Sequence, residues 1–196
     1  MSEPEYPSSS EYSNDWINLL NGRILREISA EDAKNIVSPS AGGDLPGATL
    51  EELRDMSVGR MQSSLLQREE RVLWGEVAIL CARRKKAIGV VDPLASAAEE
   101  ARVRVYIIHE FGEIDRGEFW SLARLCEFVL NSISCSLEDV RAKASSWRDL
   151  NREEILSLRR VKNLLNAMKS VEELLQGEGG VCADVRTWLG TIPQLP

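Results

Sequence analysis

Histidine is nearly absent from the sequence, since His109 is the only one among 196 residues. Any Ser–His–Asp or Cys–His catalytic arrangement would have to use this side chain, which lies in an apolar helical pattern between Ile108 and Glu110. The chain also has no HExxH or CxxC motif, no Walker loop and no dinucleotide-binding glycine fingerprint. We therefore expect no catalytic site, no metal ion, no cofactor and no small-molecule substrate, and interpret the protein as a non-enzyme.

Long apolar runs are missing as well. No window approaches the roughly 18 consecutive apolar residues that a membrane-spanning helix needs. The N-terminal residues lack the basic and apolar regions of a signal peptide, and Ser2 stands where N-myristoylation requires glycine. Any membrane contact is therefore expected to be peripheral. Cysteine is sparse, and we expect the four residues to be buried and reduced in a cytosolic or nuclear setting: Cys81, Cys126, Cys135 and Cys182.

Acidic residues outnumber basic ones, 31 to 24, which gives a formal net charge of -7. The excess is uneven, because four acids and no Lys or Arg lie in residues 1–15. The same segment is rich in Ser and Pro, a composition typical of segments that do not fold on their own. We therefore interpret residues 1–13 as an acidic flexible tail, followed by a body whose charge is nearly balanced.

Apolar residues recur with helical spacing along most of the remaining chain, and capping residues mark where helices begin. The one β-like run, residues 102–108, alternates for only a few positions and lacks a partner strand, so we expect it to be helical. The sequence thus predicts an all-α fold. Helices are expected at about 14–25, at 29–37, after a capping box at Thr49–Glu52, at 60–86 through Leu65 and Leu66, from Asp92–Pro93 to 111, at 118–134, at 136–147, at 151–176 and at 184–189. We place a division near Ser146, between an N-terminal helical domain of residues 14–146 and a smaller C-terminal helical bundle of residues 147–196.

Four adjacent cations, Arg83, Arg84, Lys85 and Lys86, end one of these expected helices. A solvated helix end whose cations offset the C-terminal dipole would account for them. In an acidic chain, however, such a concentration of positive charge also suggests an anionic partner, either a phospholipid surface or a nucleic acid backbone. Arg102 and Arg104 lie on the next expected helix and, in our hypothesis, fold towards the cluster. These six residues are the predicted anion-binding and membrane-binding site.

Aromatic residues do not favour sequence-specific nucleic-acid binding. The five tryptophans are spread about one per expected helix, as core anchors usually are. Basic and aromatic side chains do not alternate as they do in proteins that bind single strands. Sequence-independent contact with RNA remains compatible with the basic cluster.

The order of features from residue 81 to 140 resembles that of the orthomyxovirus matrix proteins, the family known best from influenza. In that family an arginine-rich helix end is followed by an Asp-Pro step that opens a basic helix. A His and a Gly come next, then a helix of small residues with a Cys, and then a hydroxyl-capped acidic helix start. The matching features here are Arg83–Lys86, Asp92–Pro93, Arg102 and Arg104, His109 with Gly112, Ser121–Cys126, and Ser136–Val140.

The resemblance implies a viral matrix protein with two helical regions that polymerises beneath the envelope. It also implies electrostatic contact with anionic lipid through Arg83–Lys86, Arg102 and Arg104, and contact with the viral ribonucleoprotein or RNA. The corresponding locations are the virion, the host cytoplasm and nucleus, and the inner face of the plasma membrane. The chain departs from the family in its acidic balance, in a basic helix with only Arg102 and Arg104, and in lacking the Cys/His cluster proposed there for zinc.

Two other functions fit the same residues. A cytosolic all-helical adaptor or scaffold subunit would use the cation cluster against an acidic protein surface. A sequence-independent RNA-binding accessory protein would use it against phosphate. Salt-sensitive binding to anionic vesicles would favour the matrix hypothesis over both.

Overall fold

A computed structural model describes residues 28–38, 45–114 and 120–196. Over these residues the structure consists of eight α-helices joined by loops and short 3-10 turns, with no strand, which confirms the predicted all-α fold. The helices are α2 (Ala30–Val37), α3 (Gly47–Gln62), α4 (Arg68–Ala87), α5 (Pro93–Phe111), α6 (Leu122–Ser132), α7 (Leu137–Ser145), α8 (Arg152–Ala167) and α9 (Val181–Leu189). The helix predicted at 14–25 and the acidic tail lie outside the described residues.

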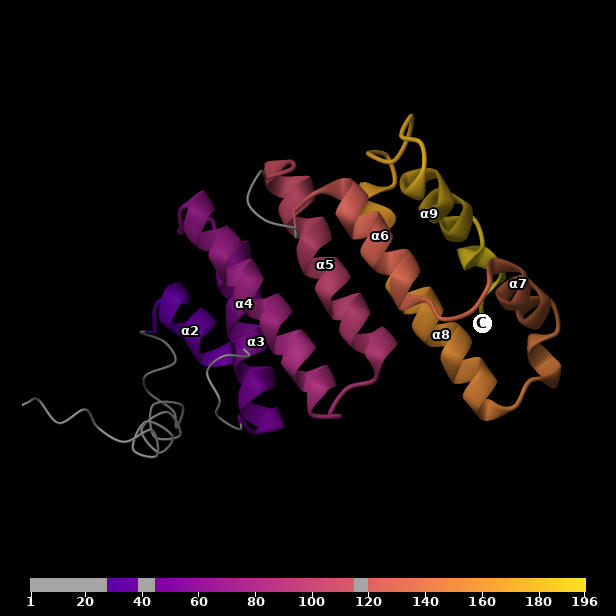
Figure 1. The fold of residues 1–196 in the computed structure, drawn as a ribbon, viewed down its shortest axis with the longest axis horizontal. Coiled ribbons are helices and arrows are strands. Elements are labelled where there is room, and N and C mark those ends of the chain that lie inside the picture. Colours follow the sequence, from indigo (N-terminus) through magenta and orange to yellow (C-terminus); the bar gives the residue numbers. More distant parts are fainter. Residues whose placement is uncertain (1–27, 39–44, 115–119) are drawn as a thin grey trace, which may run out of the picture.

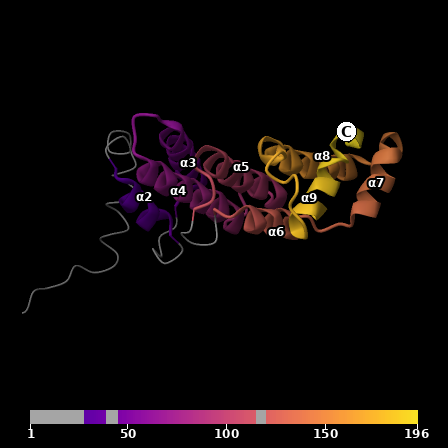
Figure 2. The same cartoon turned by 90° about the horizontal axis from the view of Figure 1, so that it is seen from above.

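Helix α5 occupies the middle of the molecule (Figure 1). Helices α2, α3 and α4 lie on one side of it and α6 to α9 on the other, an arrangement that the view from above also shows (Figure 2). The run at 102–108 falls within α5 and is helical, as predicted.

Local capping signals placed four helix starts correctly. The Asp92 carboxylate accepts hydrogen bonds from the N–H groups of Leu94 and Ala95, and Pro93 opens α5. Asn151 and Glu154 form a reciprocal capping box at the start of α8. Ser29 and Ser136 cap α2 and α7 through their hydroxyl groups. These side chains satisfy N–H groups that the first turn of a helix leaves without a partner.

The structure differs from the predicted helix boundaries by a few residues at α6 and α9, and more clearly at three other places. Helix α3 begins at Gly47 behind Pro46, so the Thr49–Glu52 segment lies inside the helix and caps nothing. The predicted helix at 60–86 is two helices, separated by a turn at residues 63–67. Ser63 holds this turn, because its hydroxyl accepts the N–H of Leu65 and so competes with continued helix. Helix α8 ends at Ala167 rather than near 176, and the chain continues as a 3-10 turn and further turns.

The core consists of two clusters of buried apolar side chains that share α5. One cluster joins α2, α3 and α4 to Val103 and Ile107, and the other joins α6 to α9 to Ala101 and Val105. Opposite faces of a single helix therefore serve both clusters. The division predicted near Ser146 is not confirmed, since α7, which precedes it, packs in the same cluster as α8 and α9.

Candidate anion-binding site

The six predicted cations do not form one surface patch. Lys85 is 2% exposed and Arg104 is 4% exposed, so both lie in the interior. Arg83 and Arg104 meet on a shared carboxylate, Arg84 contacts the end of α2, and Lys86 and Arg102 are exposed at different places. The prediction of a joint binding surface is therefore corrected for Lys85 and Arg104, which serve as ion-pair partners inside the fold.

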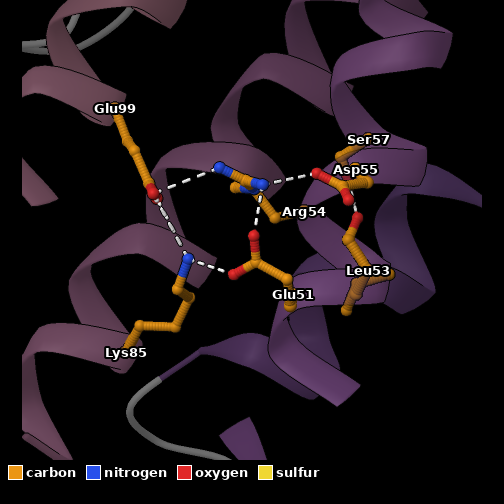
Figure 3. A network of polar contacts seen from close by, with 7 residues as sticks. All are labelled: Glu51, Leu53, Arg54, Asp55, Ser57, Lys85 and Glu99. Atoms are coloured by element: carbon orange, nitrogen blue, oxygen red, sulfur yellow. Dashed lines mark hydrogen bonds and ion pairs between the residues drawn. The ribbon is translucent and has the colours of Figure 1, made fainter. Parts of the chain in front are cut away.

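Lys85 belongs to a network of charged side chains from α3, α4 and α5 (Figure 3). Its ammonium group pairs with Glu51 and lies 3.2 Å from Oε2 of Glu99. Arg54 pairs with the same two carboxylates and with the neighbouring Asp55. A buried ammonium group is costly unless it is paired and hydrogen-bonded, and this network supplies both.

The network changes the pKa of Glu51. The hydrogen bond from Lys85, together with the positive charges of Arg54 and Lys85, lowers the pKa of this carboxyl below its ordinary value against the opposing effect of burial. The ionised form of Glu51 is therefore favoured in the folded state, and it ties α3 to α4.

A second network surrounds Glu100, whose side chain is almost fully buried. Arg83 donates two hydrogen bonds to it, from Nε at 2.9 Å and from Nη2 at 2.8 Å. Arg104 pairs with the same carboxylate from one turn further along α5, and its guanidinium group lies 4.5 Å from the centre of the Phe128 ring. Sequence reasoning missed Glu100, although its spacing of four residues from Arg104 is a known signal for an ion pair on one helix.

Arg84 joins α4 to α2. Its Nη1 atom donates to the backbone carbonyl of Ser38, the residue that follows α2, at 3.1 Å. The last carbonyls of a helix have no partner within the helix, so this arginine completes the end of α2.

Lys86 and the loop that follows it form an exposed structure, which we call the α4–α5 tip (residues 86–90). Ile88 is 46% exposed and Val90 is 55% exposed, and Lys86 has no ion-pair partner among the described residues. The tip is nevertheless ordered, because the N–H of Gly89 bonds to Lys86 and that of Val90 bonds to Lys85. Gly89 has a φ of 72°, which allows the tight reversal that ends α4.

Arg83 and Lys86 also line one cavity of about 760 Å³ between α4, α5 and α6. Glu100 and Phe128 are part of its wall. The fold thus brings together two of the six predicted residues, Arg83 and Lys86, at this cavity. Arg83 is already paired with the carboxylate of Glu100.

Arg102 lies elsewhere. It is exposed and lines a different cavity of about 750 Å³, bounded by α3, α5 and the residues that end α8. We predicted that Arg102 and Lys86 belong to the same patch, and the described structure does not place them together.

The groups considered for catalysis and metal binding are scattered. His109 is exposed near the end of α5, and burial raises the pKa of the Cys81 thiol to about 12. No group of three or more His, Cys, Asp or Glu side chains within the described ranges is arranged to hold a metal ion. Across the same ranges, no helix has the length and apolar character needed to cross a bilayer.

Comparison with protein-family models, with curated proteins and with solved structures finds no match to this chain. The resemblance to matrix proteins thus rests on the order of sequence features, chiefly in residues 81–140.

Proposed function

We propose that this protein is a viral matrix protein, which self-associates into a layer under an envelope and binds anionic membrane peripherally. The observation that carries the proposal is the α4–α5 tip. It presents the ammonium group of Lys86, which has no ion-pair partner among the residues that the structure describes, beside two exposed apolar side chains, Ile88 and Val90. A cation with adjacent apolar side chains suits the interface of an anionic bilayer, where phosphate and acyl chains lie close together.

The strength of such a contact argues for assembly. One lysine near an anionic leaflet contributes about 1 kcal/mol. Full burial of a Val or Ile side chain adds about 1.5–3 kcal/mol, and half-exposed side chains such as Ile88 and Val90 would gain only part of this. A single copy would therefore bind weakly, whereas a layer of linked copies would bind firmly through many tips.

The resemblance adds contact with the viral ribonucleoprotein to this proposal. Exposed cations such as Arg148 and Arg152 would then be available for phosphate. The membrane contact is the part that the tip supports directly, so it is the part to test first.

The test is co-flotation with vesicles of anionic or neutral lipid, at low and high salt. The informative variants are Lys86→Ser and the double variant Ile88→Ser/Val90→Ser. Changing all of Arg83–Lys86 would remove interior ion pairs along with surface charge, and would confuse unfolding with loss of binding. Leu174→Ser is the matched control, because Leu174 is also 46% exposed but lies in another turn.

We expect wild-type protein and the Leu174→Ser control to float with anionic vesicles only, and both tip variants to float less. If wild-type protein ignores vesicles of either kind at every salt concentration, the membrane proposal fails. The cytosolic scaffold hypothesis would then be preferred.

A further inference from the structure

The cavity that Arg102 lines has both apolar and polar side chains in its wall. It measures about 750 Å³ and lies between the second half of α3, the middle of α5 and the residues around the end of α8. Val58, Met61, Val103 and Tyr106 contribute to its walls. Its volume is far larger than one side chain, so it can admit a protruding loop.

The most exposed large apolar side chain of the described residues lies close by in the sequence. Leu65 is 91% exposed, in the turn that follows α3, only three residues after Gln62, which lines the cavity. The turn is held by Ser63, whose hydroxyl accepts the N–H of Leu65 and whose carbonyl accepts the N–H of Leu66. Leu65 is thus presented to solvent by an ordered turn and does not fill the cavity of its own molecule.

The charges beside these two features are opposite. In the first turn of α4, shortly after Leu65, Arg68 donates a hydrogen bond to the backbone carbonyl of Phe111. Glu69 and Glu70 follow it, are exposed, and have no ion-pair partner in the part of the chain that the structure describes. Arg102, at the cavity, is likewise exposed and has no such partner within the same ranges. The other charged groups at the cavity already bind one another, because Arg54 pairs with both Asp55 and Glu99.

We propose that the cavity is the docking site for a second copy of this chain. The Leu65 turn of each copy enters the cavity of the other, with Glu69 and Glu70 facing Arg102 of that copy. Because the turn and the cavity adjoin the same end of α3, a two-fold axis allows both contacts to form at once. A reciprocal interface of this kind closes into a dimer.

This inference rests on the proposed self-association, and it names an interface for one of its contacts. The dimer leaves the α4–α5 tip out of the interface. In Figure 1 the loop that forms the tip lies at the lower edge of the molecule, whereas the turn between α3 and α4 lies at the upper left. Dimer formation and membrane contact are therefore separable by substitution.

The test is sedimentation velocity over a wide range of protein concentration. We expect wild-type protein to shift from monomer to dimer as concentration rises, and Leu65→Asp to remain monomeric. Leu174→Asp is the control, because it places the same charge on another exposed leucine. Both positions are exposed, so neither change is expected to unfold the chain, which circular dichroism would verify.

Charge reversal gives a second, more specific test. Arg102→Glu alone and Glu69→Arg/Glu70→Arg alone should each dimerise less, because like charges then face each other. A mixture of these two variants should dimerise again, since both contacts of the mixed dimer pair opposite charges. Failure of the mixture to recover, with both variants folded, would overturn the proposed pairing.

Flotation separates the inference from the proposed function. A wild-type protein that stays monomeric at every concentration but floats with anionic vesicles overturns the dimer and leaves the membrane contact standing. A dimer that is lost in Leu65→Asp but never floats supports the interface and removes the membrane contact.

Discussion

Lys85 reaches across from α4 to Glu99 on α5, with 3.2 Å between Nζ and Oε2, and its side chain is 2% exposed. Lys85 belongs to the basic run Arg83–Lys86, yet it is one of the most buried large side chains of the described fold. Lys85 therefore has a structural role in the fold, whereas the proposed lipid contact falls to Lys86.

Replacing Lys85 by Ala should therefore destabilise the protein. The change leaves Glu51 and Glu99 with only Arg54 as an ion-pair partner among the described residues. It also removes a buried ion pair, for which the loss is about 3 kcal/mol. Lys86→Ala, one residue on, should change the free energy of unfolding by less than about 0.5 kcal/mol, as surface substitutions usually do. Urea denaturation of the two variants measures the difference, and equal effects would contradict the structure.

Glu100→Gln should be among the most harmful single changes in α5. It leaves the buried guanidinium group of Arg104, and that of Arg83, facing a neutral amide, at a cost of about 3 kcal/mol or more. Glu52→Gln is the control, since Glu52 is exposed and makes no ion pair within the described residues. The free energy of unfolding from denaturant titration is the readout, and a Glu100→Gln variant as stable as the control would exclude the network.

Much of the fold could be predicted because its signals are local. Asp92 and Asn151 mark helix starts through hydrogen bonds to groups two or three residues away, and such spacings are visible in a sequence. The break between α3 and α4 was missed because Leu65 and Leu66 continue the apolar pattern. Leu65 is in fact 91% exposed, and only the neighbouring Ser63 gives a sign of the turn.

The candidate anion-binding site was harder to predict, because contacts between helices decide which of its cations are buried and which are exposed. Nothing in the run Arg83–Lys86 distinguishes Lys85 from Lys86. Helix geometry turns Lys85 inwards, towards carboxylates on α3 and α5, and leaves Lys86 outside. Glu99 lies 14 residues from Lys85, and such a distance fixes no partner until the helices are packed.

Acid should weaken the fold through Glu51. The pKa of this carboxyl is lowered in the folded state, chiefly by the hydrogen bond from Lys85. Its contribution to stability is therefore complete above the pKa of the unfolded chain, about 4.3 for glutamate. It is lost as the pH falls through the lower pKa of the folded state.

Glu51→Gln should accordingly be less stable than wild type near neutral pH but lose less stability between neutral and acidic pH. Denaturant titrations at a series of pH values give the two slopes. Glu52→Gln, next to it, should follow the wild-type slope, and a Glu51→Gln profile parallel to wild type would rule out the assigned linkage.

The thiols should differ in reactivity. Burial raises the pKa of Cys81 to about 12, and Cys126 and Cys182 are buried as well, while Cys135 is only half-buried. Because the thiolate is the reactive form, a disulfide reagent near pH 8 should label Cys135 first in the native protein. Mass spectrometry of timed samples identifies the order, with denatured protein as the control in which all four react. Early labelling of Cys81 would contradict its burial.

A salt series should distinguish the electrostatic and the apolar contributions to membrane binding by the tip. Attraction between Lys86 and anionic lipid is screened by salt, because the Debye length falls from about 10 Å at 0.1 M to about 3 Å at 1 M. Burial of the Ile88 and Val90 side chains is not weakened by salt in this way. Lys86→Ser should therefore bind weakly at low salt and show little further loss at high salt. Ile88→Ser/Val90→Ser should bind less than wild type at low salt and lose the remaining binding at high salt. Flotation across a salt series compares the two variants directly, and identical salt profiles would mean that the tip does not bind lipid through both kinds of side chain.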